Sequence, residues 1–113
     1  MYINVSSENY VELRSGKKNK LLLESRYYKQ RSHAIRAANS IQDLFRDKNY
    51  NPFKVDGEYI SLESKKGHVL LSTHIGPYKK LMTEYYNKLV KKSSQQNGRV
   101  DIVVENIKKH LIL

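Results

Sequence analysis

The chain has no cysteine, and among its 113 residues only two are proline and five are glycine. Without cysteine it can form neither a disulfide framework nor a thiolate zinc site. No stretch approaches the roughly 18 consecutive apolar residues that a membrane-spanning helix needs. The first ten residues also lack the basic start and the apolar run of a signal peptide. We therefore expect a cytoplasmic protein that does not enter the membrane.

Acidic residues are scarce as well. Twenty-one Lys and Arg residues face 11 Asp and Glu, which gives a formal net charge of +10. This excess favours an anionic partner, with nucleic acid ahead of an anionic membrane surface. A lysine-rich surface that serves only solubility is the alternative. The length and the 39% content of hydrophobic residues fit one globular domain over residues 1–113.

Two segments of the chain resemble each other at an offset of about 48 residues. Residues 9–15 (NYVELRS) resemble residues 58–64 (EYISLES), and a lysine pair, a short apolar run and a helical pattern follow each segment. The shared order predicts a duplicated ββα unit, with one copy at residues 9–46 and the other at 58–91. Each hairpin should carry two lysines at its tip, because a short polar loop with a glycine joins its strands.

The helices are indicated by apolar residues at helical spacing. One helix is expected from an N-cap at Ser32 to about Arg46, and a second from Pro77, which suits a first helical position. The stripe that should face the core comprises Ala34, Ile35, Ala38, Ile41, Leu44 and Phe45 in the first helix and Tyr78, Leu81, Met82, Tyr85, Leu89 and Val90 in the second.

Further strands are expected at residues 2–5 and 100–104, a polar loop at 93–98, and an apolar tail at 111–113 that docks on the core or on a partner subunit. The predicted fold class is α+β. It consists of an antiparallel-rich sheet with two helices on one face, built from the two pseudo-repeated ββα units.

Basic residues interleaved with tyrosines follow the first strand pair. Lys and Arg suit phosphate, and aromatic rings suit unpaired bases. The pseudo-repeat adds further lysines at corresponding places, so the hairpin tips and the helix starts should form two basic clusters that join into one groove. The candidate nucleic-acid-binding residues are Lys17, Lys18, Lys20, Arg26, Tyr27, Tyr28, Lys29, Arg31, Lys65, Lys66, Lys79 and Lys80.

The histidines His68 and His74 would share a face if one unbroken strand contained both. Two histidines without a placed carboxylate fall short of a metal site, so no metal and no cofactor is expected. A metal-independent ribonuclease is a further alternative, because a small basic α+β protein can catalyse RNA cleavage with His, Tyr, Arg and Lys side chains.

The stretch from Lys66 to Leu81, and above all His74-Ile75-Gly76-Pro77-Tyr78, resembles the strand–His-x-Gly-Pro-Tyr–helix unit of GyrI-like effector-binding domains. The resemblance covers about a third of the chain and is absent from the first half. It implies two related β–α units that bind small amphipathic molecules or inhibit gyrase.

The leading hypothesis is a non-enzymatic protein that binds nucleic acid mainly through the phosphate backbone. One alternative is a small inhibitor or adaptor for an acidic host-protein surface, since the Lys- and Asn-rich composition suits the AT-rich genome of a phage or mobile element. The other is a GyrI-like small-molecule module. The choice between DNA and RNA stays open, and the sequence is compatible with a protein partner and with a homodimer.

Overall fold

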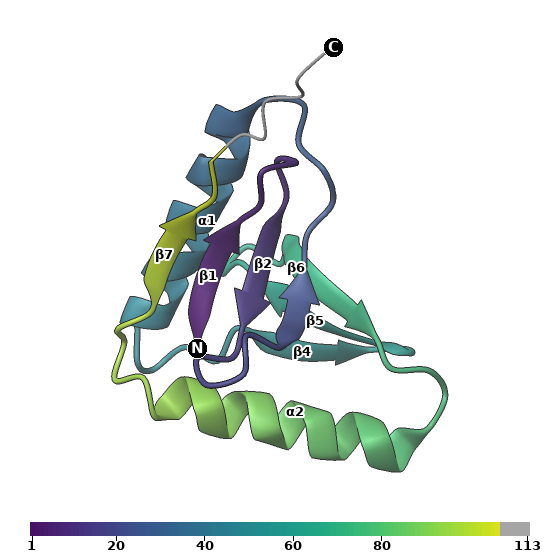
Figure 1. Ribbon diagram of the computed structural model, residues 1–113. Coiled ribbons are helices and arrows are strands. Elements are labelled where there is room, and N and C mark those ends of the chain that lie inside the picture. The colour runs from purple at the N-terminus through teal and green to yellow at the C-terminus, as the bar shows by residue number, and fades with distance from the viewer. Residues whose placement is uncertain (107–113) are drawn as a thin grey trace.

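The computed structural model describes residues 1–106, which form strands and helices in the order βββαβββαβ (Figure 1). The strands are β1 (Tyr2–Val5), β2 (Val11–Arg14), β3 (Leu21–Glu24), β4 (Phe53–Asp56), β5 (Tyr59–Glu63), β6 (Val69–His74) and β7 (Asp101–Val104). The helices are α1 (Arg31–Arg46) and α2 (Lys79–Ser94). One mixed sheet and two helices confirm the predicted α+β class.

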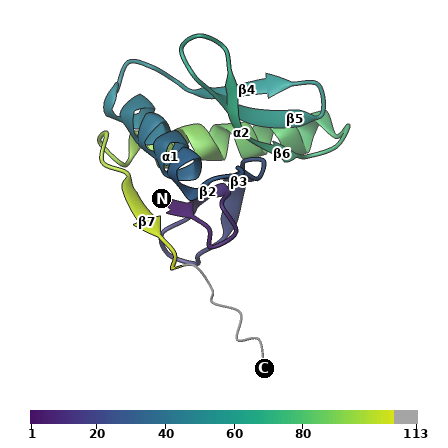
Figure 2. The same cartoon turned by 90° about the horizontal axis from the view of Figure 1, so that it is seen from above.

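The sheet has the strand order β4-β5-β6-β3-β2-β1-β7. Every neighbouring pair is antiparallel except β1 and β7, which are parallel. The order is symmetric about the junction of β3 and β6, apart from β7, which extends the sheet beyond β1. That junction is narrow, because β3 and β6 pair only through Glu24 and Ser72. The two halves of the sheet meet there at a steep angle (Figures 1 and 2).

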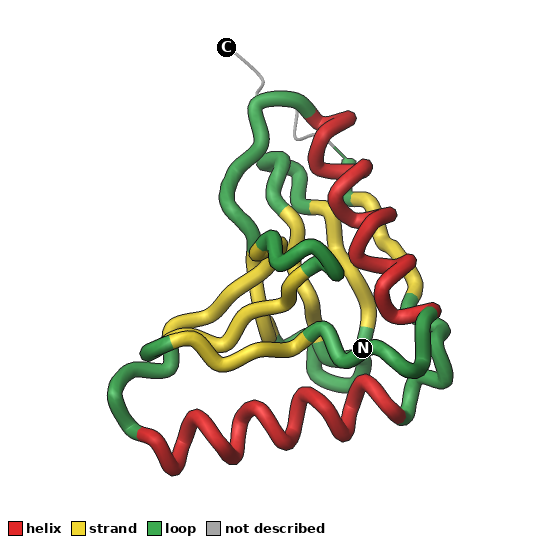
Figure 3. Tube along the Cα trace, turned by 180° about the vertical axis from the view of Figure 1, so that it is seen from behind, coloured by secondary structure: helices red, strands yellow, loops and turns green. Residues whose placement is uncertain are grey.

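The core lies between the sheet and the helices. Helix α1 packs against β1, β2 and β7, and α2 packs against β4 and β5, as the view from behind shows (Figure 3). Directly paired residues share one face of a sheet. Leu13 pairs with Leu23, and Leu62 with Leu71, and all four are almost fully buried. The paired positions Glu24 and Ser72 lie on the opposite face, so both helices cover the same side of the sheet.

The helix starts differ from the predicted ones. Helix α1 begins at Arg31 with Gln30 as its N-cap, so Ser32 is not the cap. Helix α2 begins at Lys79 with Tyr78 as its N-cap, so Pro77 precedes the helix. Neither cap residue bonds to its helix through its side chain. The chain therefore enters both helices through extended residues, and the cap preference of serine does not decide where α1 starts.

Part of the predicted core is confirmed and part is wrong. Ile41, Phe45 and Leu89 are buried, but Leu81 is 54% exposed. The buried residues of α2 are Met82 and Leu89, with Tyr85 and Tyr86 partly buried beside them. Tyr78, 66% exposed, also lies outside the core. The stripe is narrow because α2 packs mainly on β4 and β5, and the turn of the helix carries Leu81 to one side of it.

Three other boundaries complete the comparison with the sequence. Strand β4 was not predicted. Helix α2 continues to Ser94, two residues into the expected loop. The apolar tail at 111–113 lies outside the described residues.

Candidate functional site

The loop between β2 and β3 presents three exposed lysines, Lys17, Lys18 and Lys20. Ser15 closes this loop, since its backbone N–H donates to the Lys20 carbonyl oxygen at 3.0 Å and its Oγ accepts from the Lys20 N–H at 3.2 Å. Asn19 adopts a left-handed backbone conformation with φ +49°, which asparagine tolerates better than most residues. The tip is therefore a defined turn that holds its lysines outward.

The second half of α2 lies against this tip (Figure 1), and the two elements enclose a hollow of about 360 Å³. We call it the lysine hollow. Its lining residues are Met1, Ser15, Gly16, Lys17, Lys18, Lys20, Leu22, Lys88, Lys92, Gln95 and Gln96. Five of these are lysines and none is acidic. Burial lowers the pKa of the Met1 amino group, and the charge of Lys92 lowers it further.

The two walls of the lysine hollow are held together beneath it. The phenolic hydroxyl of Tyr85 on α2 donates to the carbonyl oxygen of Leu22 on β3 at 2.7 Å. Burial of this hydroxyl raises the pKa of Tyr85 above its ordinary value. The hydrogen bond fixes the position of the hairpin relative to the helix, and so the spacing of the lysines on the two walls.

The loop between β5 and β6 is built in the same way but has different surroundings. Ser64 closes it with two hydrogen bonds. Its backbone N–H donates to the His68 carbonyl oxygen at 2.9 Å, and its Oγ accepts from the His68 N–H at 3.1 Å. Lys65 forms an ion pair with Asp47, just after α1, and this hydrogen bond lowers the pKa of Asp47. The Lys65 ammonium also lies 5.7 Å from the ring centre of Tyr50. Lys65 is thus neutralised within the fold, while Lys66 is exposed.

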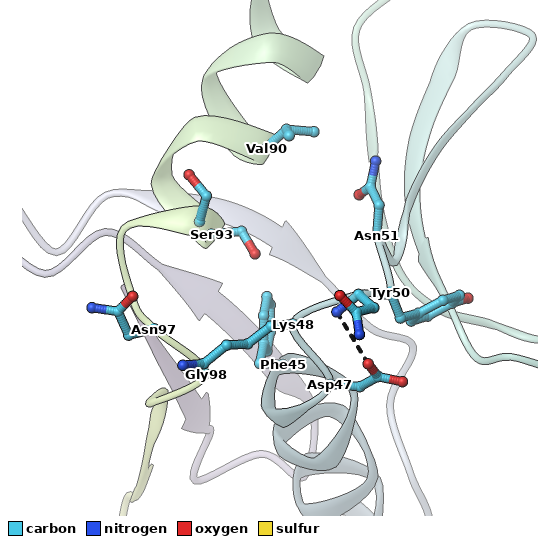
Figure 4. Close-up of a pocket in the computed structure, with 11 residues that line it drawn as sticks. Phe45, Asp47, Lys48, Tyr50, Asn51, Val90, Ser93, Asn97 and Gly98 are labelled. Carbon is cyan, nitrogen blue, oxygen red and sulfur yellow. Dashed lines mark hydrogen bonds between the residues drawn. The ribbon is translucent and has the colours of Figure 1, made fainter.

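A second hollow, of about 230 Å³, adjoins that ion pair between the ends of α1 and α2 (Figure 4). Phe45 and Val90 are among its apolar lining residues, and Asn51 and Asn97 are among its polar ones. The Asn51 amide already donates to the Tyr86 hydroxyl at 2.8 Å. Gly98 lets the chain pass close to α1, since it has φ +74° and a Cβ there would lie 3.3 Å from the Phe45 carbonyl oxygen. This hollow adds no lysine cluster to the site.

The other predicted site residues lie apart from the lysine hollow. Arg31 donates to the Ser6 carbonyl oxygen at 3.1 Å and so anchors the start of α1. Lys29 is exposed just before that helix. Lys79 and Lys80 begin α2, and Lys79 lies roughly 20 Å along the helix axis from Lys92. Arg26, Tyr27 and Tyr28 follow β3, at the end of that strand away from the hairpin tip.

The expected grouping of each hairpin tip with the start of the following helix is therefore wrong. A strand separates the two in each half: β3 carries the chain away from the first tip, and β6 from the second. Each tip instead meets the end of the helix from the other half. Lys88 and Lys92 were not predicted as site residues, because their spacing of four residues marks a helix face but not the hairpin that packs on it.

The side of the sheet without helices carries carboxylates. The Asn4 amide donates to Glu12 Oε1 at 2.9 Å, and Arg14 forms an ion pair with Glu12 Oε2 at 2.7 Å. The hydrogen bond to Glu12 raises the pKa of Arg14. Direct pairing places Glu24 beside Glu12 on this side. A phosphate backbone therefore meets less favourable charge on this face than at the lysine hollow.

His68 and His74 do not share a strand, because His68 lies in the hairpin loop and β6 begins at Val69. His74 Nε2 lies 3.0 Å from Glu58 Oε2. Both side chains of this pair are more than half exposed.

No protein-family model and no curated protein matches the chain significantly. Two solved structures are similar in fold. One is the YegP protein of E. coli, described as a protein of unknown function, with 15% identity and a TM-score of 0.57 over 96% of this chain and 93% of that one. The other is the UPF0339 protein SO3888 of Shewanella oneidensis, with 13% identity and a TM-score of 0.61 over 96% and 94%. Identities this low establish a shared fold.

Neither of these two neighbours is described as a GyrI-like domain, so that resemblance stays a prediction. Within residues 1–106, neither helix has the length and apolar character needed to cross a membrane.

Proposed function

We propose that the protein is a non-enzymatic nucleic-acid-binding protein that contacts mainly the phosphate backbone. The lysine hollow is the observation that carries this proposal. Five lysines line it without an acidic residue, and lysines that neutralise phosphates release the counterions that drive such binding. Charges of one sign held close together repel each other, and a bound polyanion removes that repulsion.

We also propose that the two halves of the sheet are copies of one structural unit. The serine-closed hairpins of both halves support this, with Ser15 bonded to Lys20 and Ser64 bonded to His68. The strand order, which is symmetric about β3 and β6, supports it too. In this proposal, residues 9–46 and 58–91 superpose as strand–strand–helix units.

The binding proposal is tested by fluorescence anisotropy with a labelled 15-nucleotide strand and its duplex, from 50 to 200 mM NaCl. Engagement of about five phosphates gives a slope of log K against log salt near −3.5 on single strands, and so an affinity loss on the order of a hundredfold. The combined variant K17Q/K18Q/K88Q/K92Q should flatten the slope by about three, with an unchanged circular dichroism spectrum.

Absence of binding at 50 mM NaCl would overturn the proposal. The lysines would then be assigned to the binding of an acidic protein partner. A binding constant insensitive to salt would overturn the phosphate contact. A labelled RNA strand is expected to stay intact during the assay, and its cleavage would overturn the non-enzymatic part in favour of a ribonuclease.

A further inference from the structure

The segment that follows β3 has a defined backbone. Ser25 exchanges two hydrogen bonds with Val11, each 2.8 Å long, and the Tyr28 N–H donates to the Asn9 carbonyl oxygen at 2.8 Å. Side chains alternate in direction along an extended chain. Tyr27 packs edge-on against Tyr10, with ring centres 5.0 Å apart. Arg26 and Tyr28 contact each other and do not join the pair of Tyr10 and Tyr27.

Arg26 and Tyr28 form a wall between two hollows. The guanidinium carbon of Arg26 lies 5.7 Å from the Tyr28 ring centre, and both residues line both hollows. The first hollow, of about 470 Å³, lies between β3 and β6 and is also lined by Glu24, Val69 and Leu71. The second, of about 360 Å³, lies against α1 and is also lined by His33, Arg36 and Ser40.

The two hollows differ in the chemistry that they offer. The β3–β6 hollow combines apolar side chains with the Glu24 carboxylate, which makes no hydrogen bond within residues 1–106. The α1 hollow offers the guanidinium of Arg36 and no carboxylate. A nucleotide has matching parts, namely a flat base with hydrogen-bonding edges and a phosphate.

We propose that the wall formed by Arg26 and Tyr28 binds an unpaired nucleotide of a single strand. The base lies against Tyr28 and Arg26 on the β3–β6 side, where Glu24 accepts a hydrogen bond from its exocyclic amino group. The adjacent phosphate lies on the α1 side, by Arg36. This inference rests on the proposed nucleic-acid binding and names its form, since a base within a duplex cannot present its face to a tyrosine.

The position of Glu24 predicts a preference among the bases. Cytosine, adenine and guanine carry an exocyclic amino group, which a carboxylate accepts well, and thymine carries none. The same carboxylate repels phosphate, which orients the strand with its backbone away from β3. A strand of cytosines should therefore bind more tightly than a strand of thymines.

The experiment compares labelled dC15, dT15 and a 15-base-pair duplex by anisotropy at pH 7.5 and 100 mM NaCl. We expect dC15 to bind most tightly. Tyr28→Leu should weaken its binding by about 5- to 160-fold, the range for a lost base stack, without changing the salt slope. Tyr28→Phe should keep the affinity within about twofold. Tyr59→Leu removes an exposed ring from another part of the sheet and is the matched control. Thermal melting of each variant establishes that it folds.

Glu24→Gln should bring the affinities for dC15 and dT15 together, because an amide both donates and accepts hydrogen bonds. Equal binding of the two strands by the unaltered protein, or a loss with Tyr27→Leu in place of Tyr28→Leu, would overturn the inference. If salt-dependent binding persists in that case, the phosphate-binding proposal stands alone. If no oligonucleotide binds at 50 mM NaCl, both proposals fail.

Discussion

The hairpins β2–β3 and β5–β6 have similar sequences and the same serine-closed loops, and each packs its tip on the end of the helix from the other half. In the first, Lys17 and Lys18 meet Lys88 and Lys92 of α2. In the second, Lys65 meets Asp47. The first arrangement concentrates charge of one sign, whereas the second neutralises it.

This difference teaches that a lysine pair acquires its role from its tertiary neighbours. An exposed ion pair such as that of Lys65 and Asp47 contributes little to stability, but it leaves less charge for a ligand. The lysine hollow instead keeps its charge, at the cost of mutual repulsion. Three changes to the chain test this contrast and the packing on which it depends.

The largest effect is expected from Leu89→Ala, since Leu89 anchors the helix that forms one wall of the lysine hollow. Leu89 is 1% exposed, so the substitution should cost about 2–5 kcal/mol from lost burial and a cavity. Leu81→Ala, on the same helix but at a 54% exposed position, should change stability by no more than about 0.5 kcal/mol. Urea unfolding measures both. Equal costs would show that α2 packs by another face.

A smaller effect is expected when the lysine charges of one hairpin at a time are removed. K17Q/K18Q and K65Q/K66Q remove the same net charge. The first should lower the salt slope of oligonucleotide binding by about 1.4, or roughly sevenfold in affinity between 50 and 200 mM NaCl. The second should change the slope by less than half as much, because Lys65 is already paired with Asp47. Identical salt slopes in the two variants would mean that binding depends on net charge alone. The two hairpins would then not differ in their role.

The smallest effect is expected from Tyr85→Phe, which removes the hydrogen bond to the Leu22 carbonyl oxygen. The loss should be about 1 kcal/mol at pH 8. Folding raises the pKa of Tyr85 above 10.0, so its contribution is complete below pH 10 and declines as the pH rises through the folded value. Denaturant unfolding at pH 8 and above pH 10 measures the free energy of unfolding at both values. Its decrease between them should be smaller in Tyr85→Phe than in the unaltered protein.

Tyr50→Phe is the matched control in the other half, since the Tyr50 hydroxyl donates to the Glu63 carbonyl oxygen at 2.9 Å. It should cost a comparable amount at pH 8 but leave oligonucleotide binding unchanged. Tyr85→Phe should weaken binding slightly by loosening the hairpin from α2. Equal binding losses in the two variants would remove the special role of the Tyr85 bond.

Local patterns predicted most of the fold. Alternation located β2 and β5, and the strong apolar stripe of α1 located its buried residues Ala34, Ala38 and Ile41. Strand β4 was not predicted, although its sequence FKVD alternates apolar and polar residues, because a run of four is the shortest that alternation can mark and only Phe53 is buried at this sheet edge. The first residue of each helix was not predicted, because both helices follow an extended residue that makes no side-chain cap hydrogen bond.

The candidate site was only half predictable for a related reason. Lys17, Lys18 and Lys20 are marked by their turn, which is local in sequence. Lys88 and Lys92 join them only because the hairpin of one half packs on the helix of the other, an arrangement set by contacts far apart along the chain. The same applies to the wall of Arg26 and Tyr28, whose hollow is completed by Val69 and Leu71 from β6.

The parallel pairing of β1 with β7 has a consequence for the order in which the protein assembles. Tyr2 lies opposite Asp101, so this edge of the sheet joins residues that are 99 positions apart along the chain. Closing a loop of this length costs on the order of 4 kcal/mol in chain entropy unless other contacts shorten it first. On the ribosome, β1 can pair with β2 early, but its other edge stays open until β7 emerges. The edge of β1 therefore stays unpaired while the chain of the second half is made, and β7 is the strand that covers it.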